Sequence, residues 1–385
     1  MSTKTKLFSS TQVGAPVLNG VVGSLIGLLD AVLVNGFGSQ AATSVVVASN
    51  VATVTFGASH SQILHGVALI SGATPAGLNG EKRVLSVMAN SFTFATSGIT
   101  DQTATGTILA KVAPAGWAKQ FSGTNLAVYQ LLAPESTGMV LHVNDTNATY
   151  TNVRGYESMT SVSTGVGPFP TVVALPSGRF WSKSNTASAG AIAWHVYADD
   201  RGFYYSCDNI LGNPDYRAQV NYFGDINPDK TNDPYACVLS GGTSNESAGG
   251  AAYGSCVYYS QWAQGIDSMN IARLANGLGG SQQIHVGAPV PYMGEYTSGS
   301  SNTYYPYPSL VHNGLDLIRP YVYRLGQGIR GTLPGILLTP QSISNRMETG
   351  DIIAGAGDFS GKTLYAQSVS NRAGVCFFDI LGDWR

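Results

Sequence analysis

The chain has 385 residues, which exceeds the roughly 250–300 at which one hydrophobic core stops growing, so we expect more than one domain. Its formal net charge of −2 and its scattered 20 basic residues argue against nucleic acid as the main ligand, because duplex binding needs clustered Lys and Arg. Only 11% of residues are charged, against about 25% in an average soluble domain, and so charge-poor a surface favours protein–protein assembly because it costs little to desolvate.

The first residues predict neither secretion nor a membrane anchor. No apolar core of a cleavable signal peptide directly follows Met1–Lys6, so we expect synthesis in the cytoplasm. The apolar stretch Val21–Val34 contains Asp30 and is shorter than the ~20 residues that span a bilayer. We therefore expect no contact with membranes.

Residues 16–36 predict one short N-terminal helix. Asn19 or Ser24 can cap its start, and Asn35-Gly36 can end it. Its face is apolar and must be covered, either by the protein's own β domain or by a neighbouring subunit. We predict that it contributes to subunit contacts together with the C-terminal tail, so that Leu28→Asp or Val32→Asp blocks assembly while the β modules stay folded. The predicted assembly contacts are Leu25, Leu28, Leu29, Val32, Leu33 and Trp384.

Residues 43–112 predict a small β-barrel or sandwich, preceded by an N-terminal arm and helix over residues 1–42. Short apolar runs are separated about every ten residues by turn residues, which is typical of such modules. The expected strands are 44–47, 51–56, 67–70, 84–88, 92–96 and 106–112.

Residues 113–385 predict a larger β-rich domain with long Gly/Ser/Tyr loops. Asp199-Asp200-Arg201 is expected to form a hairpin turn, and the chain is expected to finish with a second hairpin. The expected strands are 126–132, 138–144, 179–183, 193–198, 202–207, 363–368 and 374–380. The predicted fold class is therefore mainly β, with several β-sandwich or small-barrel modules and one short helix.

Two Gly/Ser-rich loops with adjacent aromatic residues are candidate contact surfaces. Aromatic side chains on loops provide contact area at low entropic cost, whether the partner is a protein or a sugar. The same residues can also lie in ordinary cross-strand pairs. The residues concerned are Tyr258, Tyr259, Trp262, Tyr296, Tyr304, Tyr305 and Tyr307.

The sequence contains no recognisable catalytic motif, metal motif or cofactor motif, so we expect no enzyme, no metal and no cofactor. His60 and His65 flank one loop, and we interpret them as single loop histidines rather than as metal ligands. We interpret five aspartates as turn and loop residues rather than as a glycan-hydrolase pair or a calcium site; they are at 199, 200, 225, 229 and 233. The four cysteines, at 207, 237, 256 and 376, are expected to be buried thiols rather than disulfides.

Several segments resemble virion proteins of tailed bacteriophages of proteobacteria. They are Gly14–Gly20 (GAPVLNG), Ser24–Ala31 (SLIGLLDA), Leu33–Gly38 (LVNGFG), Gly72–Gly80 (GATPAGLNG), Ser91–Phe94 (SFTF), Gly116-Trp117, Phe121–Asn125 (FSGTN), Arg154–Glu157 (RGYE) and Arg330–Gly335 (RGTLPG). The resemblance extends over nearly the whole chain and implies a tail-associated structural protein. It brings no catalytic residue to this sequence.

We therefore expect a non-enzymatic subunit of the virion, assembled in the host bacterial cytoplasm. Its expected place is the tail, baseplate or head–tail region, and its expected partners are copies of itself and other virion structural proteins. The alternatives are a head decoration protein and a peripheral module that binds host-surface glycans. A glycan-cleaving or cell-wall-cleaving enzyme is the third hypothesis, which a zymogram against host envelope would test.

Overall fold

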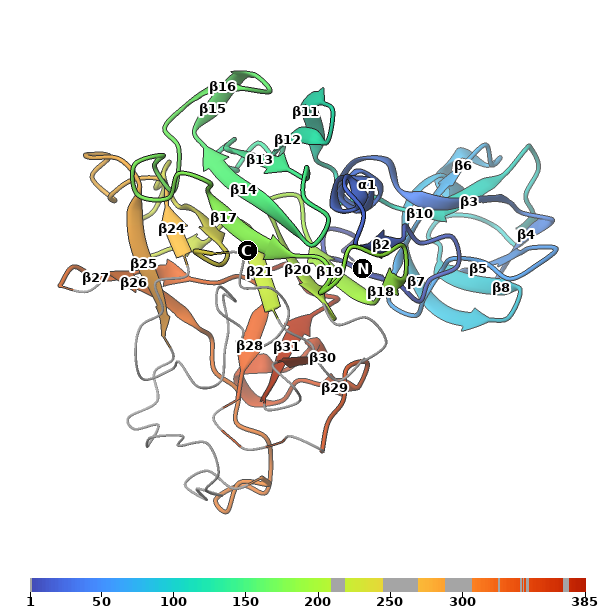
Figure 1. The fold of residues 1–385 in the computed structure, drawn as a ribbon. Helices are drawn as coiled ribbons and strands as arrows, with labels where there is room; N and C mark the ends of the chain where they lie inside the picture. The colour runs from blue at the N-terminus through green and yellow to red at the C-terminus, as the bar shows by residue number, and fades with distance from the viewer. Residues whose placement is uncertain are drawn as a thin grey trace.

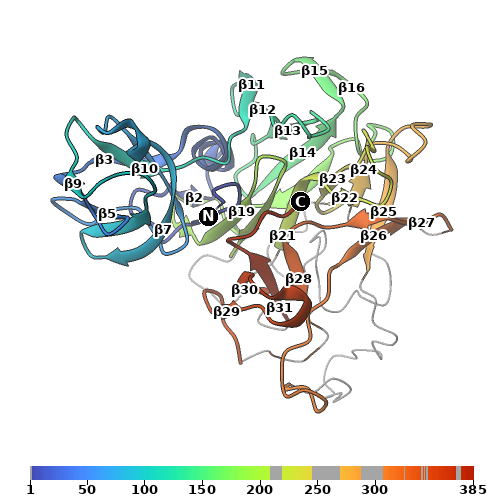
Figure 2. The same cartoon turned by 180° about the vertical axis from the view of Figure 1, so that it is seen from behind.

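A computed structural model describes residues 2–208, 219–244, 269–287, 307–324, 326–339, 341, 343, 346–369 and 374–385. In these residues the chain is mainly β with one short α-helix, which confirms the fold class expected from the sequence. Views from opposite sides show a small curled sheet at one side of the molecule and a larger body of sheets beside it (Figure 1, Figure 2). No helix among these residues is long and apolar enough to cross a bilayer.

The small module is an antiparallel eight-stranded sheet that curls around its own core. Apolar residues alternate along the second and third of its strands in chain order, so that Val45, Val47, Ala52 and Val54 point inward with at most 1% exposure. All buried members of this core lie between residues 45 and 110. The strands, in spatial order, are β3 (Phe37–Ala41), β10 (Leu109–Val112), β6 (Val67–Ser71), β7 (Gly80–Met88), β8 (Ser91–Ala95), β5 (Val51–Thr55), β4 (Ser44–Ala48) and β9 (Gln102–Thr103).

The N-terminal helix is shorter than predicted. Helix α1 spans Ser24–Leu29 and continues as a π-helical segment over Asp30–Asn35, which ends at Gly36 with φ 72°. The predicted C-terminal end is therefore correct, whereas the start at residue 16 is wrong. Residues 18 and 19 form strand β2 (Leu18–Asn19) instead, because they pair with the distant strand β18 (Ala191–Ile192).

The N-terminus of α1 is capped by a residue from far along the chain. Asp145 Oδ2 accepts hydrogen bonds from the backbone N–H groups of Leu25 (2.8 Å) and Ile26 (3.2 Å). A carboxylate is favoured there, because the first N–H groups of a helix have no partner within it. The predicted caps are wrong: α1 has no cap from Asn19, and the Ser24 hydroxyl donates to the Asn19 carbonyl instead.

Asp145 belongs to a buried ion pair that joins α1 to a five-stranded antiparallel sheet. It pairs with Lys183, and both side chains are fully buried. Lys183 Nζ also donates to the carbonyls of Val21 (3.0 Å) and Asn147 (2.8 Å), and the Thr151 hydroxyl donates to Asp145 Oδ1 (2.8 Å). The strands of this sheet, in spatial order, are β11 (Ala118–Gly123), β12 (Leu126–Gln130), β13 (Val140–Asn144), β14 (Tyr150–Tyr156) and β17 (Arg179–Ser182).

The apolar face of the helix is covered by its own chain. α1 lies between the small module and the five-stranded sheet in both views (Figure 1, Figure 2). Its cluster includes Trp117, Tyr129 and Trp181. Of the predicted assembly contacts, Leu25, Leu28, Leu29, Val32 and Leu33 are 0% exposed and Trp384 is 6% exposed. These six side chains present no surface to a neighbouring subunit, so we correct that expectation and assign them to the internal core.

The largest sheet has ten strands and curls on itself. At one edge, β1 (Lys6–Ser9), β19 (Trp194–Ala198) and β20 (Gly202–Cys207) pair in that order, and the predicted hairpin at 199–201 joins the last two. Six further strands follow β20 in space: β21 (Gln219–Asp225), β23 (Cys237–Ser240), β24 (Met269–Ile271), β25 (Gln282–Gly287), β26 (Tyr321–Arg324) and β27 (Gly328–Thr332).

The ring of these six strands is closed by β22 (Asn227–Pro228). β22 directly follows β21 and pairs with β27 at the other edge of the sheet. We call β21, β23, β24, β25, β26 and β27 the six-strand barrel, which β22 closes. Its interior is apolar and includes Val238, Met269, Ile271, Ile284 and Val322, each at most 1% exposed.

A four-stranded C-terminal sheet covers the inner face of β19 and β20. Phe378 stacks on Tyr197 with ring centroids 3.7 Å apart, and Tyr204 contacts both Phe378 and Trp384. The predicted final hairpin is correct, because β30 and β31 pair over their length. The strands, in spatial order, are β28 (Ile336–Leu338), β31 (Gly374–Asp379), β30 (Thr363–Val369) and β29 (Ile352–Ala354).

Candidate functional site

One end of the six-strand barrel forms a pocket. Side chains alternate along a strand, so the residues on the same face as the barrel interior continue its lining toward the strand ends. Gln282 is on the same face of β25 as the buried Ile284, and Arg324 is on the same face of β26 as the buried Val322. At this end, the apolar interior therefore gives way to polar and cationic groups.

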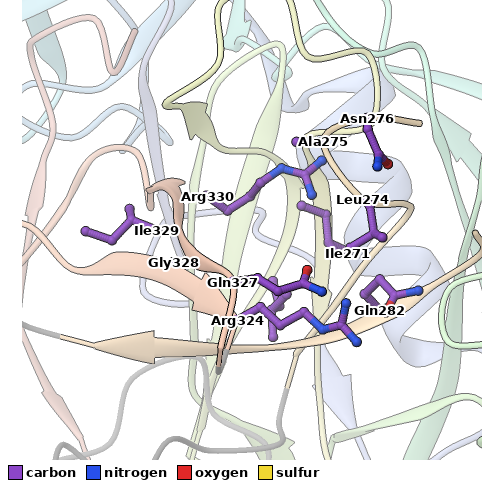
Figure 3. A pocket seen from close by; sticks show the side chains of 11 residues that line it. Ile271, Leu274, Ala275, Asn276, Gln282, Arg324, Gln327, Gly328, Ile329 and Arg330 are labelled. Atoms are coloured by element: carbon purple, nitrogen blue, oxygen red, sulfur yellow. The ribbon is translucent and has the colours of Figure 1, made fainter. Parts of the chain in front are cut away.

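The pocket has a volume of about 340 Å³ and is open on one side. Its walls are the connection from β24 to β25 and the hairpin of β26 and β27, and both arginines extend from the hairpin toward the opposite wall (Figure 3). The lining residues are Ile271, Leu274, Ala275, Asn276, Gln282, Ile284, Arg324, Gln327, Gly328, Ile329 and Arg330. The end of a barrel is a common place for small-molecule binding.

The two arginines of the pocket differ in their partners. Arg330 is paired with Asp233, with its Nε 2.8 Å and its Nη2 2.7 Å from Oδ2, and its Nη1 donates to the Arg273 carbonyl at 2.9 Å. Arg324 has no side-chain hydrogen bond or ion pair to any residue that the structure describes. None of the lining residues is acidic, so one guanidinium charge in this pocket is uncompensated.

Three side-chain amides complete the polar part of the lining. Gln282 Nε2 donates to the Gly280 carbonyl at 2.8 Å, and Asn276 Oδ1 accepts from the Leu278 N–H at 2.9 Å. Gln327 is exposed on the turn of the hairpin. Because an amide both donates and accepts, these groups can pair with hydroxyls as well as with anions. The arrangement is suited to holding a small polar ligand against an apolar floor.

Three of the five aspartates considered from the sequence, Asp199, Asp225 and Asp233, are held in internal contacts. Asp225 Oδ2 accepts from the Thr137 N–H (3.0 Å) and from Arg201, and Asp233 pairs with Arg330. Asp199 pairs with Arg385, yet burial raises the pKa of its carboxyl above the ordinary value, with the neighbouring guanidinium acting against that shift. Within the described residues, these groups cross-link loops and do not face one open space.

The two loop histidines do not converge on one site. His60 Nε2 lies 3.1 Å and 3.0 Å from the carbonyls of Met88 and Ser91, and its Nδ1 accepts from the Gln62 N–H at 3.1 Å. His60 therefore fastens its loop to β7 and β8. In the part of the chain that the structure describes, no group of three or more His, Cys, Asp or Glu residues is arranged to hold a metal ion.

Three of the four cysteines lie in the described residues, and each is a buried free thiol. They are Cys207, Cys237 and Cys376. Burial raises the pKa of the Cys207 thiol to about 12, because the thiolate would lose its hydration in the core. These cysteines therefore behave as small core residues, as the sequence suggested.

The aromatic loops predicted from the sequence are only marginally described. Tyr258, Tyr259, Trp262, Tyr296, Tyr304 and Tyr305 lie outside the described residues. Tyr307 is described, and it packs, partly buried, against the core of the C-terminal sheet. The described strand ends next to these loops, Ser240, Met269 and Gly287, are at the opposite end of the barrel from the pocket.

Sequence reasoning missed the pocket. Its residues come from three separate segments, 271–276, 282–284 and 324–330, and no short motif links them. One local signal was available: two arginines flank a Gly-containing hairpin turn, with Gly326 and Gly328 both at positive φ. No protein-family model matches this chain, and no curated protein is detectably similar to it, so these contacts alone describe the site.

Proposed function

We propose that the chain is a non-enzymatic structural subunit of a tailed-bacteriophage virion that acts by protein–protein assembly in the tail, baseplate or head–tail region. The proposal is supported by the sequence resemblance and by the way in which the fold uses its few charges. Eleven of the 42 charged residues are buried within the described part of the chain. Charged side chains are almost never fully buried unless they are paired.

The buried cations hold chain segments together. Arg83 donates to the carbonyls of Ser2, Thr5, His65 and Ile380, so it joins the small module to both terminal segments. Arg154, Arg179 and Lys183 play comparable roles inside the larger body. The remaining charged residues leave the outer surface about as poor in charge as the composition suggests. Removing water from such a surface costs little free energy when it meets another subunit.

Exposed apolar residues on described loops offer contact points for that assembly. Val172 and Val173 are 55% and 94% exposed in the segment before β17, and Leu310 and Val311 are 88% and 93% exposed in the segment before β26. Adjacent exposed apolar pairs are typical of surfaces that bind another protein. We infer that a second virion chain or a second copy of this chain covers them.

The test is incorporation of variants into particles. Val173→Asp and Leu310→Asp are expected to prevent incorporation of the chain, because they place an ion on a surface that becomes buried, while near-native CD spectra show that the fold persists. Val173→Thr keeps the size without the charge and serves as the matched control, which should be incorporated normally. Normal particles from both Asp variants would contradict the proposal.

Copy number separates the proposed place from head decoration. Quantitative mass spectrometry of purified particles should give on the order of ten copies for a ring in the tail or connector, as closed cyclic symmetry implies. A count on the order of hundreds would instead indicate a head decoration protein.

A further inference from the structure

The pocket at the end of the six-strand barrel contains one positive charge that no neighbouring carboxylate neutralises. Arg330 is neutralised by Asp233, whereas Arg324 has no side-chain partner among the described residues. A guanidinium binds a carboxylate or a phosphate through two parallel hydrogen bonds. A phosphate monoester carries a charge of about −1.5 to −2 at neutral pH, whereas a carboxylate carries a single charge. The single uncompensated charge therefore matches a carboxylate.

The rest of the lining matches a hydroxylated carbon skeleton. Leu274 and Ala275 are partly exposed and form the apolar surface of the pocket, with the buried Ile271 and Ile284 beneath them. The amides of Gln282 and Gln327 stand at the rim, where each can both donate to and accept from a hydroxyl. The volume of about 340 Å³ lies at the low end of the roughly 300–1,000 Å³ of small-molecule sites, which suits a ligand of monosaccharide size.

We propose that this pocket binds a carboxylate-bearing sugar, with Arg324 pairing with the carboxylate, the glutamine amides with the hydroxyls, and the partly exposed Leu274 and Ala275 with the C–H face of the ring. Arg330 is a positioning residue, because its pair with Asp233 fixes the hairpin that carries Arg324. The site stands apart from the proposed assembly role, since its residues differ from the exposed Val and Leu pairs.

Calorimetric titration of the full chain with sodium D-glucuronate tests the proposal, with D-glucose as the neutral probe of the same shape. We expect glucuronate to bind at least about tenfold more tightly than glucose, because a hydrogen bond between charged groups is worth more than one between neutral groups. Arg324→Gln should remove about that tenfold advantage. Arg346→Gln removes the same charge from an exposed site outside the pocket and should leave binding unchanged.

Two further probes define what else could fill the pocket. Sodium acetate and N-acetyl-glutamic acid amide carry a carboxylate without a sugar ring. If either binds as tightly as glucuronate, the sugar assignment is overturned in favour of a free acid or an acidic peptide. Equal binding of glucose and glucuronate, no binding of any probe, or an unchanged affinity in Arg324→Gln would also overturn it.

Folding of the variant is checked separately. Arg324 makes no side-chain hydrogen bond or ion pair among the described residues, so Arg324→Gln should melt within about 2 °C of the unmodified chain. Gln282→Ala is a second variant in the same pocket and should weaken glucuronate binding at least twofold. Particles built with Arg324→Gln should assemble normally, so a failure of this proposal is distinguishable from a failure of the assembly role.

Discussion

The small module and the six-strand barrel are both curled antiparallel sheets of short strands, but they are built from the chain in different ways. All eight strands of the small module lie between residues 37 and 112, and its buried core uses only residues from that range. The barrel takes its strands from residues 219 to 332, and its core is continuous with β19, β20 and the C-terminal sheet. The first is a local unit, whereas the second depends on segments far apart in sequence.

Because of this difference, the larger body needs stabilising polar contacts more than the small module does. The small module is held together by apolar packing and by strand pairs within residues 37–112. The larger body contains the fully buried Lys183–Asp145 pair and the buried Arg179, which donates to Asn270 and Gly241. Such contacts are directional, so they favour one arrangement of distant segments over others.

The largest expected effect is on the larger body. Lys183→Met leaves Asp145 buried without its cation and should lower the free energy of unfolding by about 3–5 kcal/mol. Urea denaturation followed by tryptophan fluorescence measures this change selectively, because the sequence has no Trp between residues 43 and 112.

The control for that prediction is a pair at the surface of the same body. Lys119 and Asp30 form a 2.9 Å ion pair in which both side chains are about a quarter exposed. Lys119→Met should therefore cost about 1 kcal/mol or less. Equal losses of unfolding free energy in the two variants would show that the buried pair stabilises the fold no more than the exposed pair.

An intermediate effect is expected at the junction between the two regions. Arg83→Lys keeps the charge but cannot reach all four carbonyls that the guanidinium contacts, so it should cost about 1–3 kcal/mol. Hydrogen exchange should then show the small module opening separately from the larger body. Lys111→Met, which removes one exposed bond to the Asn35 carbonyl, should change stability by about 0.5 kcal/mol or less. If the small module and the larger body still opened together in Arg83→Lys, Arg83 would not couple the two regions.

The smallest effect is the pH dependence that His142 contributes in the larger body. Burial, aided by Arg154, lowers the pKa of His142 below its ordinary value of 6.5. Below about pH 6.5, the unfolded chain therefore binds a proton at His142 that the folded chain does not bind. The free energy of unfolding should fall as the pH drops through this range. His142→Gln should reduce that slope in urea titrations between pH 7 and pH 5. A slope unchanged by the substitution would assign the effect to another group.

Sequence patterns predicted the local parts of the fold well. Six of the eight strands of the small module appear close to their expected bounds, whereas β3 and β9 were not expected. Ser49 and Asn50 make the β4–β5 turn with φ 51° and 62°. The helix start was mispredicted because β2 pairs with β18, more than 170 residues away. The pocket could not be predicted for the same reason: Gln282 and Arg324 become neighbours only when β25 pairs with β26.

The β26–β27 hairpin has a consequence for selectivity. Beyond β26, its outer strand is held by the two residues of β22 and by one bond from the Asp229 N–H to the Arg330 carbonyl. The Arg330 side chain adds its ion pair with Asp233 and its bond to the Arg273 carbonyl. These contacts anchor the wall that carries Arg324 to the segments on the other side of the pocket. The width of the cavity is then set by the protein before a ligand arrives, which favours discrimination among related ligands over tolerance of them.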